Sequence, residues 1–122
     1  MTLRDLAVEL VAASDLKLQW RLVMEFLEEF RHEAPAMKHR LITGAPEMVD
    51  TRWDSFLAGL AEHLAEVAGL PKPAWVDEPY RCLSESWFTN SLATAQRRAL
   101  KTSPAAFRNR NIFLELHDLE VA

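Results

Sequence analysis

Apolar side chains recur at helical spacing between residues 16 and 30, and this stripe is the strongest constraint on the fold. One row of the stripe runs from Leu16 through Trp20 to Phe30 in steps of four and three residues. A second apolar row lies beside it. Such steps return to the same face of a helix, and two adjacent rows make a stripe wide enough to pack on two flanks. The sequence therefore predicts a helix from about residue 16 to about Glu33, at the centre of an all-α fold.

Start and stop signals delimit further helices on both sides of the stripe. Thr2 and Asp5 have the spacing of a capping box, and Pro35 can open a short helix through Arg40. A later apolar stripe ends at Gly69, where a C-terminal glycine is expected. The other expected helix starts are Ser14, Thr51, Ser91 and Ser103-Pro104. A row of alanines on the helix before Gly69 would let another helix approach closely; it comprises Ala58, Ala61 and Ala65.

Length and composition agree with a compact helical protein. The chain has 122 residues, of which 49% are apolar and 26% charged, which is ordinary for one globular domain. Three prolines within residues 70–79 predict a rigid loop in which Trp75 plugs the core. Residues 112–116 can form a short strand or an extended arm. The prediction is one all-α, compact, bundle-like domain over residues 1–122, with four to five helices, a proline-marked loop and a short C-terminal extended segment.

The charges are unevenly distributed along the chain. The formal net charge is −4, from 14 basic and 18 acidic residues. Residues 41–86 contain three basic and eight acidic side chains, whereas residues 87–114 contain five basic and none acidic. The five are Arg97, Arg98, Lys101, Arg108 and Arg110. A basic segment on an acidic protein has three interpretations: a solvated face paired with the acidic segment, a docking site for a partner, or a contact to nucleic acid. The overall negative charge makes nucleic acid the least favoured of these.

Other features exclude several classes of protein. The single Cys82 excludes an internal disulfide and a cysteine-pair metal site. The N-terminus contains Asp5 and no long apolar run, so a secretory signal is not expected, and no window is apolar enough to span a membrane. These observations predict a cytoplasmic protein.

Few residues have a pattern typical of catalysis. Glu28 and His32 are four residues apart, and His63 and Glu66 are three apart, but neither pair has a recognisable third ligand. Neither serine near Cys82 lies in a nucleophile elbow. The sequence therefore predicts no catalytic residue, no metal site and no cofactor, and a metal-dependent hydrolase using His63, Glu66 and His32 remains the weakest alternative.

Three stretches of the chain together resemble a known family. The first is Leu18–Arg31, the second runs from Thr43-Gly44 through Arg52–Leu64, and the third comprises Pro73-Ala-Trp75, Trp87-Phe88 and Ser103–Arg110. The family is an uncharacterised, largely actinobacterial group of small helical proteins. Many members carry a repressor-type helix-turn-helix before this domain, and their genes often neighbour nucleotidyltransferase-like toxin candidates. The resemblance covers roughly residues 16–119. This chain lacks the family's glycine near Asn111, and the residues before Ser14 are too few for a helix-turn-helix, so DNA binding is not implied.

The resemblance implies a non-enzymatic, antitoxin-like or transcription-regulator-associated protein that recognises another protein, such as a toxin-like neighbour. The residues expected to bind the partner are Arg97, Arg98, Lys101, Arg108, Arg110 and Phe107. A homo-oligomer remains open, and no membrane partner is expected. The main alternative is a small-ligand-binding or sensing domain with an apolar pocket lined by Trp75 and Trp87.

Overall fold

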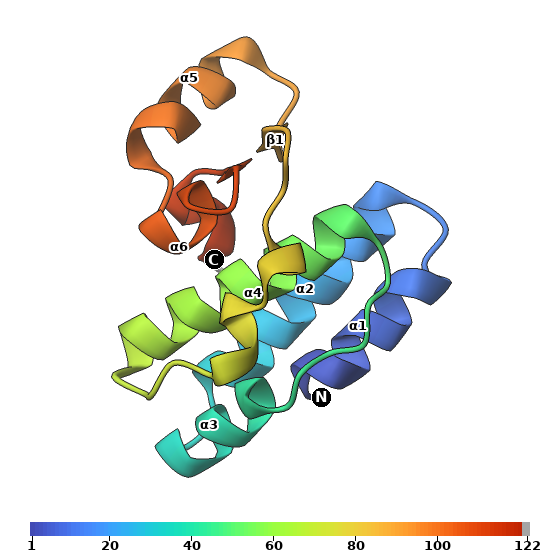
Figure 1. The fold of residues 1–122 in the computed structure, drawn as a ribbon, viewed down its shortest axis with the longest axis vertical. Helices are drawn as coiled ribbons and strands as arrows, with labels where there is room; N and C mark the ends of the chain where they lie inside the picture. Colours follow the sequence, from blue (N-terminus) through green and yellow to red (C-terminus); the bar gives the residue numbers. More distant parts are fainter. Residues whose placement is uncertain (121–122) are drawn as a thin grey trace.

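A computed structural model of the protein describes residues 1–120 and confirms the all-α fold. The described residues form six α-helices, one more than the upper expectation, because the start at Ser103-Pro104 opens a separate helix of four residues. The elements are α1 (Leu3–Ala12), α2 (Leu16–Arg31), α3 (Pro35–Thr43), α4 (Thr51–Ala68), the 3-10 helices η1 (Ala74–Asp77) and η2 (Pro79–Arg81), β1 (Trp87–Phe88), α5 (Ala93–Thr102), α6 (Ala105–Arg108), β2 (Ile112–Phe113) and the 3-10 helix η3 (Leu116–Leu119). Helix α5 lies apart from α1–α4 (Figure 1).

Helices α1, α2 and α4 start with the predicted capping chemistry, at or within one residue of the expected position, whereas the expected cap at Ser91 is wrong because α5 begins after Leu92 without a side-chain cap. Thr2 forms the expected capping box with Asp5. At α2 the cap is Asp15 rather than Ser14, and its carboxylate accepts the amide hydrogen of Leu18 at 2.8 Å. At α4 the cap is Asp50 rather than Thr51. An ionised carboxylate is favoured over a hydroxyl at the positive end of a helix, which explains both shifts.

Helix α4, and not α2, is the centre of the fold. Eleven of its residues are buried, against four in α2. Leu16 and Leu18 at the start of α2 are exposed, so the wide stripe there does not pack along its full length. The residues of α4 between its larger apolar side chains are mostly alanine, glycine and serine, which lets neighbours approach it from several sides. It contacts α1, α3, α6 and both 3-10 helices of the proline-marked loop.

An aromatic cluster joins α2, α4 and β1. The rings of Trp20, Trp53, Phe56 and Trp87 lie with centroids 5.2–6.3 Å apart, mostly edge to face. Edge-to-face packing is favourable because the positive edge of one ring meets the negative face of the next. The cluster therefore joins residues 87–88 to the helices of the first half of the chain.

The proline-marked loop is anchored as predicted through Trp75. Its indole is buried and donates a hydrogen bond to the carbonyl of Ile42 at 3.1 Å. The loop is also held by Arg81, whose buried guanidinium lies over the Trp75 ring at 4.7 Å and donates to the carbonyl of Pro46 at 2.7 Å. Gly69 begins the loop with φ +68°, the left-handed conformation expected of a glycine after a helix.

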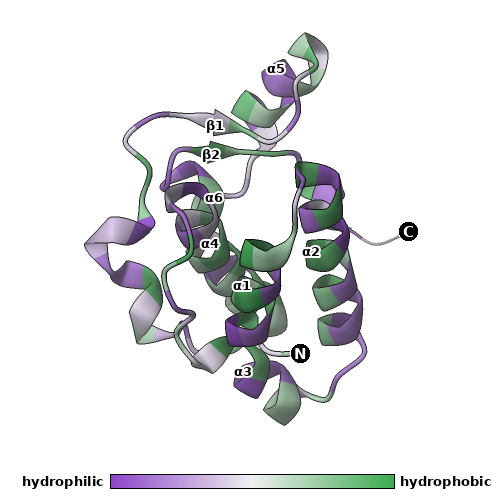
Figure 2. Cartoon of the chain, turned by 90° about the vertical axis from the view of Figure 1, so that its right-hand side faces the viewer, coloured by the Kyte–Doolittle hydropathy of each residue, from purple (hydrophilic) through white to green (hydrophobic). Residues whose placement is uncertain are grey.

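The first two residues of the expected C-terminal extended segment, Ile112–Phe113, form a strand in a parallel pair, whereas Leu116 at its end begins η3. Trp87 aligns with Ile112 and Phe88 with Phe113, and β1 and β2 run side by side below α5 (Figure 2). Asn111 precedes β2 with φ +63° and donates its side-chain amide to the carbonyl of Leu83 at 2.7 Å. Asparagine tolerates the left-handed region better than most residues. Asn111 therefore adopts this conformation at the entrance to β2 without being a glycine.

Helix α6 packs tightly against α4 at Gly59, which lies next to Ala58 but outside the predicted row of alanines. A Cβ atom at Gly59 would lie 2.8 Å from Cδ1 of Phe107 and 3.3 Å from the carbonyl oxygen of Ala106. Overpacking costs about 1–3 kcal/mol and helix propensity returns about 1 kcal/mol, which leaves a net loss of up to about 2 kcal/mol. We expect Gly59→Ala to lie in the upper half of this range, with the free energy of unfolding lowered by about 1–2 kcal/mol, because the Phe107 ring that the new Cβ would meet is fully buried. Gly44→Ala is the matched control, since its Cβ would meet only the flexible end of the exposed Arg4 side chain. Urea unfolding checks the pair, and a Gly59→Ala protein as stable as the control would contradict this packing.

Candidate protein-docking surface

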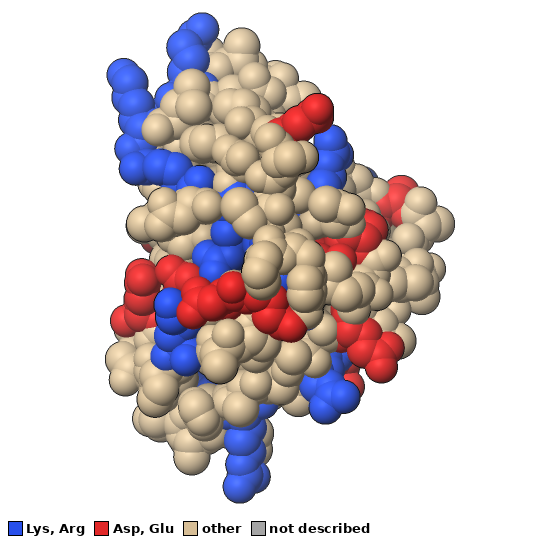
Figure 3. Space-filling view, viewed as in Figure 1, with Lys and Arg blue, Asp and Glu red and all other residues tan. Residues whose placement is uncertain are grey.

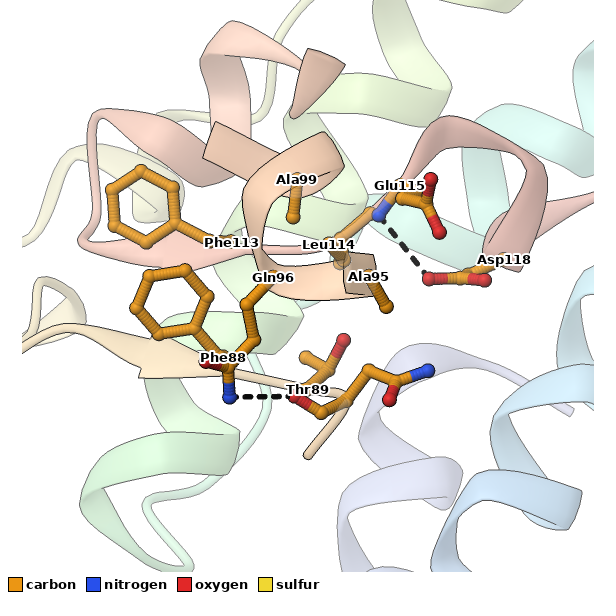
Figure 4. A pocket seen from close by; sticks show the side chains of 10 residues that line it. Phe88, Thr89, Ala95, Gln96, Ala99, Phe113, Leu114, Glu115 and Asp118 are labelled. Atoms are coloured by element: carbon orange, nitrogen blue, oxygen red, sulfur yellow. Dashed lines mark hydrogen bonds between the residues drawn. The ribbon is translucent and has the colours of Figure 1, made fainter. Parts of the chain in front are cut away.

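Helix α5 is fixed to the protein through one narrow face. Ala95 and Ala99 are its two buried residues, and they lie one turn apart. Figure 4 shows them beside Leu114 and the side chains of Phe88 and Phe113, whose rings are stacked with centroids 5.1 Å apart. The crevice between these side chains has no room for a water molecule. The small alanines thus hold α5 tightly, and the rest of its circumference is left at the surface.

The opposite side of α5 is both cationic and apolar. At 100° per residue, Arg97, Leu100 and Lys101 lie away from the buried alanines. All three are exposed, and Leu100 is 53% exposed. Within residues 1–120, the charged groups of Arg97 and Lys101 have no hydrogen-bond or ion-pair partner. We call these three residues, together with Arg108, the cationic α5 face.

Arg108 joins this face because it closes the end of α5. Its guanidinium donates to the carbonyls of Ser103 at 2.8 Å and Lys101 at 3.4 Å. The last carbonyls of a helix lack partners within the helix, and a cation there is favoured by the helix dipole. Arg108 is exposed, so its charge adds to that of Lys101.

Arg98 serves partly as a clamp at the edge of the face. Its Nε lies 2.5 Å from a carboxylate oxygen of Glu115, which is buried just before η3. The hydrogen bond to Arg98 holds the pKa of Glu115 below its ordinary value, and the same bond raises the pKa of Arg98. The pair ties α5 to the segment after β2 and neutralises part of the Arg98 charge.

The structure contradicts the expectation that Arg110 and Phe107 bind a partner, since both are buried. Arg110 is 7% exposed and donates to the carboxylate of Glu62 at 3.0 Å and to the carbonyls of Ala106 and Val76 at 2.7 and 2.8 Å. Phe107 has no exposed surface and lies against α4. Arg110 is buried because Glu62, 48 residues earlier, supplies the compensating charge. The basic segment thus contains one structural arginine, Arg110, and a separate group of exposed cations on the cationic α5 face.

The exposed cations of the cationic α5 face lie in a part of the surface where basic side chains outnumber acidic ones. Figure 3 shows basic side chains projecting from the part that contains α5, and acidic side chains gathered in a band below it. Within residues 1–120, the acidic side chains of the 41–86 stretch form ion pairs with Lys72, Arg81 and Arg110, and none with Arg97, Lys101 or Arg108.

The three residues of the hydrolase alternative do not form a metal site. His32 is exposed and lies 2.8 Å from the carboxylate of Glu28 on the same helix. His63 lies against the ring of Phe107, with centroids 5.9 Å apart. In the part of the chain that the structure describes, the ligand atoms that converge within 4.8 Å belong instead to Glu115, His117 and Asp118. Glu115 of this group is already bound by Arg98, so the cluster is explained by its internal contacts.

Partial burial of His63 gives the protein a specific acid sensitivity. Burial of the imidazole lowers the pKa of His63 from its ordinary value of 6.5, and the charge of Glu66 only partly offsets this. The unfolded chain then binds more protons than the folded chain below about pH 6.5, so the free energy of unfolding falls as the pH falls from about 7.5 to about 5.5. Urea unfolding across this range should show the fall in the wild type and in His32→Gln. It should be reduced in His63→Gln, and an unchanged slope in that variant would contradict the burial of His63.

The two tryptophans of the ligand-binding alternative lie in different surroundings. Trp75 is covered by Arg81 and bonded to Ile42, whereas Trp87 belongs to the aromatic cluster. The cavity of about 200 Å³ that Trp87 lines does not include Trp75. This cavity is therefore not the expected pocket, which was to be lined by both Trp75 and Trp87.

The apolar part of the candidate surface was not predicted from the sequence. Leu92 and Leu100 are 64% and 53% exposed, at the two ends of α5. The signal was present, because Leu100 is three residues from Arg97 and next to Lys101, outside the row of buried alanines. An apolar residue that shares an exposed helix face with two cations is the pattern that could have located this candidate surface.

Comparisons with protein-family models, curated proteins and solved structures find no match for this chain. The resemblance to the actinobacterial family remains a prediction. Among the helices of residues 1–120, none combines the length and apolar character that a membrane crossing requires.

Proposed function

We propose that the protein is a non-enzymatic interaction module, antitoxin-like or associated with a transcription regulator, that binds an acidic surface of a partner protein through the cationic α5 face. The observation that carries the proposal is that Arg97, Leu100 and Lys101 share the exposed side of α5. At 100° per residue, Arg97 lies between Leu100 and Lys101, so two unpaired cations and an exposed leucine stand together on a helix whose opposite side is fixed. Arginine is enriched among the residues that contribute most to protein–protein binding, and an exposed leucine beside it adds apolar area that a partner can bury.

The rigidity of the surface supports binding. The alanine face of α5, the closure by Arg108 and the clamp by Arg98 hold the helix before a partner arrives. A surface that is already ordered loses less conformational entropy on association. Its positive charge would speed encounter with an acidic partner and disfavour a basic one.

A protein partner fits the charges better than a nucleic acid does. The exposed cations occupy one short helix and its end, while the chain as a whole carries a net charge of −4. A duplex presents a charge about every 1.7 Å along its axis, and it would bring many of these charges near the acidic band. A partner with a local acidic surface would avoid that repulsion.

Co-expression with the product of the adjacent gene tests the proposal, since the resemblance points to a toxin-like neighbour. We expect the two proteins to copurify as one species in size-exclusion chromatography and the growth defect caused by the neighbour to be relieved. Failure to form a complex, together with steeply salt-dependent binding to a DNA duplex, would replace the protein partner by nucleic acid.

A further inference from the structure

An open groove on another part of the molecule has the features of a small-molecule site. It lies among α2, α3, α4 and η3 and has a volume of about 370 Å³, within the range of roughly 300–1,000 Å³ typical of ligand pockets. Seven of its eleven lining side chains are apolar. Leu27, Phe30 and Leu64 are almost fully buried, whereas Val67 at the rim is 72% exposed.

The polar side chains of the groove favour an anion. Lys38, Arg31 and His63 line it together with one acidic residue, Glu120. The Lys38 ammonium lies 5.5 Å from the centroid of the Phe30 ring, directly beside the apolar wall. A cation placed over an apolar surface can pair with a charged head group while the wall covers an apolar body.

We propose that this groove binds a small amphipathic anion, with an apolar body of medium chain length and a single carboxylate. The apolar wall would cover the body, and Lys38, whose ammonium lies beside that wall, would attract the carboxylate. Helix α5 does not contribute to the groove, so the proposal is independent of the docking function.

Three ligands with the same tail test the role of the head group. Isothermal titration calorimetry of the full chain would compare decanoate, decan-1-ol and decyltrimethylammonium. We expect saturable binding of decanoate with one site per chain, and an affinity for decyltrimethylammonium lower by about tenfold or more, because opposite charges attract more strongly near low-dielectric surfaces. Equal affinity for the three ligands would overturn the proposed anion selectivity.

Val67→Glu tests the location of the site without disturbing the core, since Val67 is mostly exposed. The introduced carboxylate should repel the ligand and weaken decanoate binding by about tenfold or more. Val8→Glu is the matched control, because Val8 is 64% exposed on α1 and outside the groove. Equal weakening in both variants would place the binding elsewhere and overturn the proposal.

The same measurements identify other occupants of the groove. Decanoate binding that appears only after deletion of residues 121 and 122 would show that the end of the chain fills the groove, which would overturn the proposal for the full chain. A dimer that Val67→Glu dissociates, with no decanoate binding to the wild type, would assign the groove to a second copy and overturn it as well.

Discussion

Replacing Arg110 by methionine is expected to lower the free energy of unfolding by about 3–5 kcal/mol, a large part of the stability of a protein of this size. The guanidinium is 7% exposed and joins Glu62 of α4 to the carbonyls of Ala106 and Val76. Methionine fills much of the same space but leaves a poorly hydrated carboxylate and two carbonyls without a donor. Such orphaned groups, rather than the lost volume, account for the expected cost.

Two further variants separate this explanation from simple loss of a charge. Arg97→Met removes an exposed arginine and should change the stability by no more than about 0.5 kcal/mol. The double variant Glu62→Leu/Arg110→Met removes the orphaned carboxylate and should recover part of the loss. Urea unfolding measures all three. A stable Arg110→Met protein would contradict a structural role and reopen its assignment to the docking surface.

Reversal of both charges on the cationic α5 face is the second large expected effect. The variant Arg97→Glu/Lys101→Glu should weaken binding to the partner by about 100-fold or more, since like charges brought together at an interface cost several kcal/mol. Both side chains are exposed and without ion-pair partners in residues 1–120, so the melting temperature should change little. Calorimetry with the purified partner measures the affinity, and thermal unfolding checks the fold.

Helix α2 supplies a matched control for this reversal. Lys17 and Arg21 are also exposed and four residues apart, so Lys17→Glu/Arg21→Glu makes the same change in net charge at the same spacing. We expect it to leave the affinity within a few-fold of the wild type, because distant charges are screened at physiological salt. Equal losses in the two double variants would show that overall charge, and not the α5 face, controls binding.

Local patterns predicted the helices well because capping and periodicity are local properties. The box at Thr2, the proline start at Pro35 and the glycine stop at Gly69 occur where expected. At α2 and α4 the predicted cap, Ser14 or Thr51, is one residue away from the observed cap, Asp15 or Asp50. At both sites a hydroxyl residue and an aspartate are adjacent in the sequence, and the helix dipole favours the aspartate carboxylate.

Properties that depend on distant residues were predicted less well. The stripe of α2 was taken for the centre because it is wide, but the small residues around α4 allow closer packing, as Gly59 against Phe107 shows. Arg110 was counted with the surface cations because its partner Glu62 is 48 residues earlier in the chain. The groove was missed because its walls come from segments that are not adjacent in sequence.

Hydrogen–deuterium exchange of the complex tests the central claim most directly. With the product of the adjacent gene bound, the account predicts slower exchange in peptides that cover residues 93–108, which include α5 and α6, and unchanged exchange in peptides from α2. Exchange in residues 93–108 that is the same with and without the partner, alongside protection of another surface, would contradict the assignment of the cationic α5 face as the docking site.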